Sequence, residues 1–267
     1  QMRLEFHQLI EKEQLTYHFQ PILSAKNGEI IAYEALMRSQ LATLKNPEII
    51  LKIAGSLIYN IHIGNKDLDG NTWADAFANA IDGINLSAPI GIADVTWKTM
   101  AWSLKTVKAK NPFDVKQVRL ISGRCSPDYS YGISDPHEDL NRTGRAVLNI
   151  WNERVNLAQE QYNPGRTIVL IRSYDLLSYC LYEEENHRFR TSDYEWSENK
   201  NGNLIGTEIL TGKQCFTWQP HGSQFTIHEV VPPGSIKFTI KAPPILNKKD
   251  FLEDIQFDNS WVSIIRQ

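Results

Sequence analysis

The segment GIADVTWKTMAWSLKTVK, residues 91–108, decides the fold expected for this chain. Two stretches rich in apolar, β-branched and aromatic side chains, residues 90–97 and 100–107, predict strands, because such side chains suit a pleated surface. Only Lys98 and Thr99 separate the two stretches, so their connection is a tight turn. The segment therefore predicts a β-hairpin.

This hairpin is expected to carry polar side chains on one face. Side chains alternate along a strand, so Ser103 and Lys105 share one face while Trp102 and Leu104 share the other, buried face. Asp94 lies near the end of the facing strand. The hairpin is thus expected to bring a carboxylate, a hydroxyl and an ammonium group to one edge of a sheet.

The elements around the hairpin alternate between helices and strands. Apolar residues recur at helical spacing in residues 71–81 and 139–162, which predicts two helices. Residues 115–122 and the strongly apolar residues 166–172 predict strands, the latter in the centre of a sheet. Residues 175–267 predict short strands and polar loops. The order predicts an α/β fold: a central mixed sheet flanked by helices, with a β-rich C-terminal part.

The element order together with Asp94 and Lys105 resembles the PD-(D/E)XK type II restriction endonucleases over residues 57–267. In that family an aspartate, a second acid and a lysine meet at one edge of the sheet, and the acids bind Mg²⁺. The resemblance implies that Asp94 is a Mg²⁺ ligand and that Lys105 positions or activates the attacking water. The position of the second acid is taken here by Ser103.

The serine leaves the second metal ligand open. Some enzymes of this class carry serine there and supply the acid from a nearby helix. Asp75 in the first predicted helix is the favoured secondary ligand, and Glu153 in the long helix is its rival. In the alternative interpretation neither residue is catalytic: Asp94 caps a turn, and Lys105 is a solvated strand residue.

The resemblance implies a Mg²⁺-dependent, sequence-specific endonuclease that acts on double-stranded DNA as a homodimer, because cutting two strands requires two sites. A non-catalytic DNA-binding protein on the same scaffold is the alternative. Amide and basic side chains that can pair with base edges or phosphates follow the hairpin in the chain. These candidate DNA-binding residues are Arg119, Arg124, Asn199, Lys200, Asn201, Gln219, His221 and Gln224. For each of them ordinary turn or loop chemistry is at least as good an explanation, as at the turn dipeptide Asn201-Gly202.

Residues 1–56 are expected to form an appendage that ends at Gly55-Ser56, where two pieces of different origin would be joined. Residues 2–14 predict a helix, and YHFQPILSAKNGEIIAYEALMR, residues 17–38, predicts a hairpin that turns at Asn27-Gly28. Residues 1–54, and most specifically residues 17–38, resemble the beginning of the EAL family of cyclic-di-GMP phosphodiesterases, whose metal-binding glutamate corresponds to Glu34. The later motifs of that family do not follow in order, and such chemistry needs several carboxylates. We therefore expect no cyclic-di-GMP hydrolysis, although a phosphodiesterase or sensor stays a further functional alternative.

The overall composition is that of a globular protein. Of 267 residues, 42% are hydrophobic and the formal net charge is -3, which argues against coating nucleic acid through bulk charge. Three widely spaced cysteines give neither a disulfide framework nor a zinc pattern. No apolar run approaches the roughly 18 residues of a membrane span, and we recognise no secretory signal. A cytoplasmic protein without membrane partners is expected.

Overall fold

The structure, a computed structural model, describes the backbone of residues 15–23 and 30–39 and the whole of residues 43–163 and 165–265. It divides the chain into two compact units, Gln1–Pro47 and Glu48–Gln267. In the first unit β1 (Leu15–Leu23) pairs antiparallel with β2 (Ile30–Ser39), which confirms the two N-terminal strands. The helix expected over residues 2–14 and the Asn27-Gly28 turn lie outside the described residues.

Helix α2 (Pro47–His62) crosses the point at which the appendage was expected to end. It continues through Gly55 and Ser56 without interruption, and the division into units falls between Pro47 and Glu48. The helix begins at a proline, whose missing N–H is not needed in the first turn. Its buried residues recur every fourth position, as an amphipathic helix requires: Ile53, Leu57 and Ile61.

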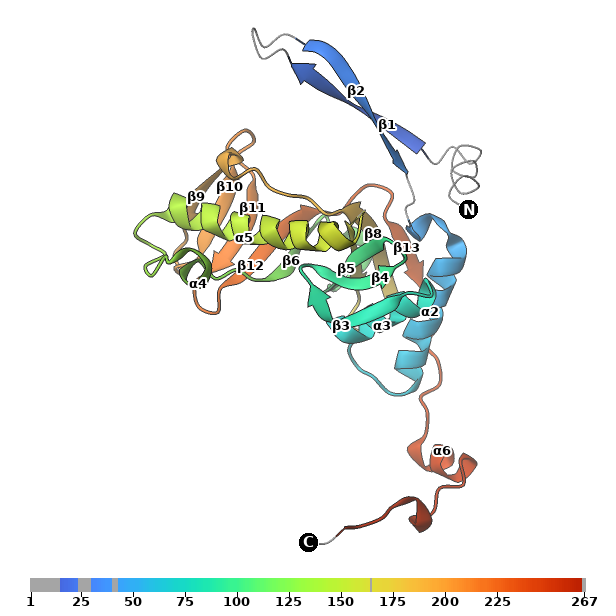
Figure 1. The fold of residues 1–267 in the computed structure, drawn as a ribbon. Coiled ribbons are helices and arrows are strands. Elements are labelled where there is room, and N and C mark those ends of the chain that lie inside the picture. The colour runs from blue at the N-terminus through green and yellow to red at the C-terminus, as the bar shows by residue number, and fades with distance from the viewer. Residues whose placement is uncertain (1–14, 24–29, 40–42, 164, 266–267) are drawn as a thin grey trace. The chain divides into compact units, whose positions relative to one another are not determined.

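A six-stranded mixed sheet forms the centre of the second unit (Figure 1). Its strand order is β13-β8-β7-β5-β4-β3, and every neighbouring pair is antiparallel except β5 and β7. The expected mixed sheet is thereby confirmed, and so is the central place of the apolar strand β7. The strands are β3 (Ile84–Ile90), β4 (Ala93–Trp97), β5 (Met100–Lys108), β7 (Gly165–Arg172), β8 (Ser178–Glu185) and β13 (Ile236–Thr239).

Helix α3 (Gly70–Ala80) covers one face of this sheet. Asp69 caps it by accepting a hydrogen bond from the backbone N–H of Thr72. Trp73 and Phe77 are fully buried, and the Phe77 ring packs edge-on against Trp102 of β5 with ring centroids 5.5 Å apart. The face of β5 that carries Trp102 is therefore the face that α3 covers.

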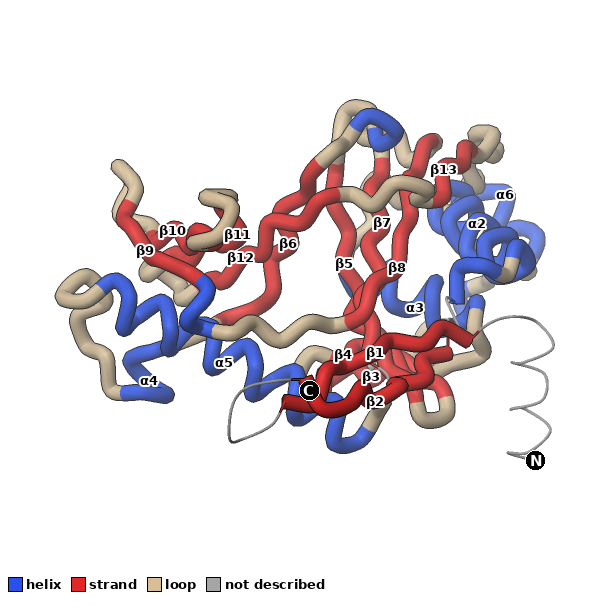
Figure 2. Tube along the Cα trace, turned by 90° about the horizontal axis from the view of Figure 1, so that it is seen from above, coloured by secondary structure: helices blue, strands red, loops and turns tan. Residues whose placement is uncertain are grey.

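A second, five-stranded sheet has the order β6-β12-β11-β10-β9, with all neighbours antiparallel. Helix α5 (Leu140–Gln161) packs along it (Figure 2). The same helix also contacts β3 and β7 of the first sheet. The approach is close, since a Cβ on Gly144 of α5 would lie 2.2 Å from the Trp196 side chain. The strands are β6 (Gln117–Arg124), β9 (Tyr194–Glu198), β10 (Leu204–Glu208), β11 (Gln214–Gln219) and β12 (Gln224–Val230).

The remaining elements are short. Two further α-helices are α4 (Pro127–Tyr131) and α6 (Lys248–Asp254). The 3₁₀ helices are η1 (Thr43–Lys45), η2 (Pro112–Asp114), η3 (Thr191–Asp193) and η4 (Asn259–Trp261). Of the helices in the described ranges, none combines the length and the apolar character needed to cross a membrane.

One expected strand is wrong in extent. The strand expected over residues 90–97 is broken at Gly91, which has a φ of +63° and turns the chain from β3 into β4. A Cβ at Gly91 would lie 2.2 Å from the backbone oxygen of Arg154, so this turn lies directly against α5. Strand β3 itself was not expected, because its side chains are mostly exposed and do not alternate in polarity.

Candidate active site

The structure brings Asp94, Ser103 and Lys105 together on one face of the β4–β5 hairpin. Asp94 Oδ2 accepts a hydrogen bond from the backbone N–H of Leu104 at 2.7 Å and one from Ser103 Oγ at 3.3 Å. These bonds fix the carboxylate against β5, on the face opposite to Trp102. Ser103 is buried, whereas Asp94 and Lys105 are half-buried. The expected shared face of Ser103 and Lys105 is the observed one.

The surroundings of Lys105 disfavour the charged form of its side chain. Burial lowers the pKa of Lys105 below its ordinary value, and the positive charge of Arg154 lowers it further, while Asp94 acts in the opposite direction. Within the described part of the chain no carboxylate lies within 4.0 Å of the Lys105 nitrogen, and no hydrogen bond to it is found. The Asp94 carboxylate is therefore close enough to attract the Lys105 side chain electrostatically, although the two form no ion pair.

Arg154 of α5 is a member of this site that the sequence reasoning missed. Its guanidinium lies over β6, where its Nη1 is 2.7 Å from the place a Cβ would take on Gly123. A signal was present in the sequence, because Arg154 falls on the apolar stripe of α5 that contains Ile150, Trp151, Val155 and Ala158. A charged residue on the buried stripe of a helix needs an explanation.

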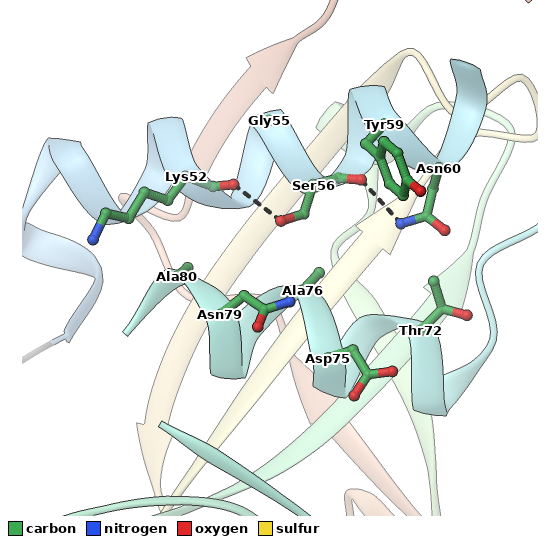
Figure 3. A pocket seen from close by; sticks show the side chains of 10 residues that line it. All are labelled: Lys52, Gly55, Ser56, Tyr59, Asn60, Thr72, Asp75, Ala76, Asn79 and Ala80. Carbon is green, nitrogen blue, oxygen red and sulfur yellow. Dashed lines mark hydrogen bonds between the residues drawn. The ribbon is translucent and has the colours of Figure 1, made fainter. Parts of the chain in front are cut away.

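Asp75 lies on the other side of the sheet. It belongs to α3, it is exposed, and its Oδ1 accepts a hydrogen bond from Asn85 Nδ2 at 2.7 Å. Since α3 covers the Trp102 face and Asp94 lies on the opposite face, the structure does not bring these two carboxylates together. Asp75 instead borders a cavity of about 620 Å³ between α2 and α3 (Figure 3). Its lining residues are Lys52, Gly55, Ser56, Tyr59, Asn60, Thr72, Asp75, Ala76, Asn79 and Ala80.

Glu153, the rival second ligand, points away from the site. It is exposed, and its Oε1 accepts a hydrogen bond from the Tyr131 hydroxyl at 2.5 Å. That bond, together with burial and the negative charge of Glu153, raises the pKa of Tyr131 to about 12. Successive residues of a helix are about 100° apart around its axis, so Glu153 and Arg154 face different surroundings.

The side chains present fit a Mg²⁺ site in which the protein supplies only one or two of the ligands. No group of three His, Cys, Asp or Glu side chains that could enclose a metal ion occurs among the described residues. Mg²⁺, however, commonly takes one or two carboxylates from a protein and completes its shell with waters and substrate phosphates. Asp94 can supply one such carboxylate, because its Oδ1 carries no hydrogen bond in the described part of the chain.

Most of the candidate DNA-binding residues gather at one end of the five-stranded sheet. Arg124 of β6 lies opposite Gln224 of β12, which lies opposite Gln219 of β11. His221 is in the turn between β11 and β12. Strands β9 and β11 both run antiparallel to β10, so the β9–β10 turn, with Asn199, Lys200 and Asn201, lies at the same end of the sheet.

Two of the candidates have local roles in the structure. Asn199 Oδ1 accepts hydrogen bonds from the backbone N–H groups of Asn201 and Asn203, which closes the β9–β10 turn. Arg119 lies opposite His228, away from the end where Arg124 lies. Partial burial lowers the pKa of His228 and the charge of Arg119 adds to the effect, so this imidazole is biased toward its neutral form.

The chain matches no model of a protein family, no curated protein and no solved structure. The site must therefore be interpreted from its own geometry.

Proposed function

We propose that residues 48–267 form a Mg²⁺-dependent, sequence-specific endonuclease that cuts double-stranded DNA as a homodimer. The observation that carries the proposal is that a carboxylate held by hydrogen bonds and an ammonium group that forms no ion pair in the described part of the chain lie together on one face of the sheet. Hydrogen bonds from the Leu104 backbone N–H and the Ser103 hydroxyl hold Asp94, and Lys105 lies on the same sheet face without an ion pair among the residues that the structure describes. Such an arrangement has little value for stability and suits a charged substrate.

The order of elements supports the same proposal. The chain runs from α3 through the antiparallel strands β3, β4 and β5, then through β6 of the second sheet and helices α4 and α5 to β7, which lies parallel to β5. This is the helix, hairpin, helix and apolar strand order that the resemblance to the PD-(D/E)XK endonucleases rests on. Asp94, Ser103 and Lys105 lie on the face of the sheet opposite to the one that α3 covers.

Each residue has a distinct part in phosphodiester hydrolysis. Asp94 would hold Mg²⁺, which when bound neutralises charge on the phosphate and on the leaving oxygen. Lys105 would orient the attacking water and offset the negative charge that develops on the phosphate. The oxygen of the water joins phosphorus as the water releases a proton to solvent, the bond from phosphorus to the deoxyribose oxygen breaks, and that oxygen takes up a proton from solvent. Ser103 would keep the Asp94 carboxylate in place by its hydrogen bond.

The test compares the wild-type chain and Asp94→Asn on a mixture of plasmids with Mg²⁺ or with EDTA. The account predicts discrete fragments from the wild type in Mg²⁺ and none in EDTA. Asp94→Asn should stay folded and should still shift plasmid DNA in a gel, because losing a negative charge lessens repulsion of phosphate, but it should not cut. Wild-type cutting rates in Asp94→Asn would refute the assignment of Asp94.

Two acidic controls sharpen this test. Asp75→Asn and Glu153→Gln remove carboxylates that lie outside the Asp94 face, so both variants should cut at close to the wild-type rate. A parallel incubation with cyclic-di-GMP tests the remaining alternative, and no turnover is expected. A wild-type chain that binds DNA but never cuts it would favour the non-catalytic DNA-binding alternative.

A further inference from the structure

The positive charge of Arg154 has no counter-ion within the described residues. The side chain is half-buried on the apolar stripe of α5, yet neither an ion pair nor a hydrogen bond of its guanidinium is found there. Two other arginines, both buried, show how this fold ordinarily treats such a group. Arg166 pairs with Glu183 at 2.7 Å, and Arg172 pairs with Asp67 at 2.6 Å. Arg154 therefore departs from the pattern of its own structure.

The backbone around Arg154 leaves room for its side chain to reach toward β6. At Gly123, where φ is +96°, a Cβ would lie 2.7 Å from Nη1 of Arg154 and 3.8 Å from its Cζ. The absence of a side chain at Gly123 lets the guanidinium lie against the β6 backbone. On the other side, the Gly91 turn packs against the Arg154 backbone oxygen, which fixes this part of α5 against the β3–β4 connection.

The same place holds a second cation. Arg154 repels the ammonium of Lys105, and Asp94 is the carboxylate close enough to attract it. Two positive charges with a single anchored carboxylate leave a net positive charge in a partly buried place, where the effective dielectric is low. Burying like charges together costs free energy unless an anion joins them. The charge pattern thus points to an anionic ligand.

We propose that Arg154 binds a phosphate of the DNA backbone beside the phosphate that is cut, and so holds the duplex between the Asp94 face and the Arg124 end of the second sheet. This inference rests on the proposed function and extends it to a residue of α5. The connection is continuous: Arg154 lies against Gly123, Arg124 follows Gly123 in β6, and Arg124 lies opposite Gln224. A planar guanidinium with several donors suits phosphate oxygens well.

The test measures DNA affinity as a function of salt concentration in the non-cutting Asp94→Asn background. Each phosphate contact contributes about 0.9 to the slope of log affinity against log salt concentration. Adding Arg154→Gln should therefore lower the slope by about one and weaken binding similarly for all sequences. Adding Arg154→Lys, which keeps the charge, should leave the slope near its original value. Arg145→Gln is the matched control, since it removes one positive charge from an exposed position of the same helix and should leave binding unchanged.

Folding of each variant is checked by thermal melting. If Arg154→Gln does not fold, Arg154→Met, which keeps the aliphatic stem, replaces it in the same salt series. An unchanged slope in the folded neutral variant, or equal effects of Arg154→Gln and Arg145→Gln, would overturn the inference. If the wild-type chain binds DNA with an Arg154-dependent slope but never cuts, the inference stands and the proposed cleavage fails. A wild-type chain without DNA affinity would overturn both.

Discussion

The two faces of strand β5 treat charge in opposite ways. On the face covered by α3, the Glu183 carboxylate accepts hydrogen bonds from Trp102 Nε1 at 3.0 Å and from Arg166 Nε at 2.7 Å. On the opposite face, Lys105 and Arg154 lie close to Asp94, and neither cation forms an ion pair within the described residues. Both faces of the same sheet therefore contain buried or half-buried charges.

The contrast separates structural charge from functional charge. A buried ion pair with satisfied hydrogen bonds fixes its neighbours, and breaking it leaves an uncompensated charge. A half-buried cation without a partner does not stabilise the fold, so its presence points to a ligand that arrives later. Substitutions on the α3 face should therefore change stability, whereas substitutions on the Asp94 face should change activity.

The largest effect on stability is expected from Glu183→Ala. Side-chain exposure is 10% for Arg166 and 2% for Glu183, so the variant would take the 2.7 Å partner from a buried guanidinium and leave it the longer contact with Glu185, at 3.9 Å. Removing one partner of such a pair typically costs about 3–5 kcal/mol. Urea unfolding measures the loss. The control is Glu253→Ala, whose ion pair with Lys249 is exposed and should contribute less than about 1 kcal/mol. Equal losses in the two variants would contradict the distinction drawn here.

A smaller effect is expected from Gly123→Ala. Its φ of +96° is strained for any residue with a Cβ, which costs on the order of 1–3 kcal/mol. The new methyl group would also displace the Arg154 guanidinium, so DNA binding should weaken. Gly132→Ala is the matched control, because φ there is +63° but nothing lies within 4 Å of the added Cβ. Gly132→Ala should lose stability and keep its DNA affinity, and a loss of affinity in both variants would argue against a specific effect at Gly123.

Much of the fold could be predicted from local patterns. Residues 71–81 and 139–162 show helical periodicity, and Asp69 and Asp139 occupy the N-cap positions that such helices favour. The apolar stretch 166–172 predicts a central strand, because a strand buried on both faces lacks the alternation of apolar and polar residues. The shared face of Ser103 and Lys105 followed from strand geometry alone. These features depend on short stretches of chain.

The rest depends on contacts between distant segments. Which side of the sheet a helix covers is set by tertiary packing, so the separation of Asp75 from Asp94 could not be read from their spacing. Strand β3 is exposed and irregular in polarity, and it forms because β4 pairs with it. Arg154 could have been predicted from the sequence, because it is a charged residue that interrupts the apolar stripe of a helix. The neighbouring Glu153 lies outside that stripe.

The most direct test of the account is Lys105→Met, with thermal melting and DNA cleavage measured on the same preparation. The variant keeps the aliphatic stem and removes a desolvated charge, so it should melt at the wild-type temperature or above it. Loss of a group that stabilises transition-state charge costs roughly 3–4 kcal/mol, or about three orders of magnitude in rate at the upper value. We therefore predict a stable protein that barely cuts DNA. A variant that melts far below the wild type, or that cuts within about tenfold of it, the factor given by about 1.4 kcal/mol, would contradict the assignment of Lys105 to the active site.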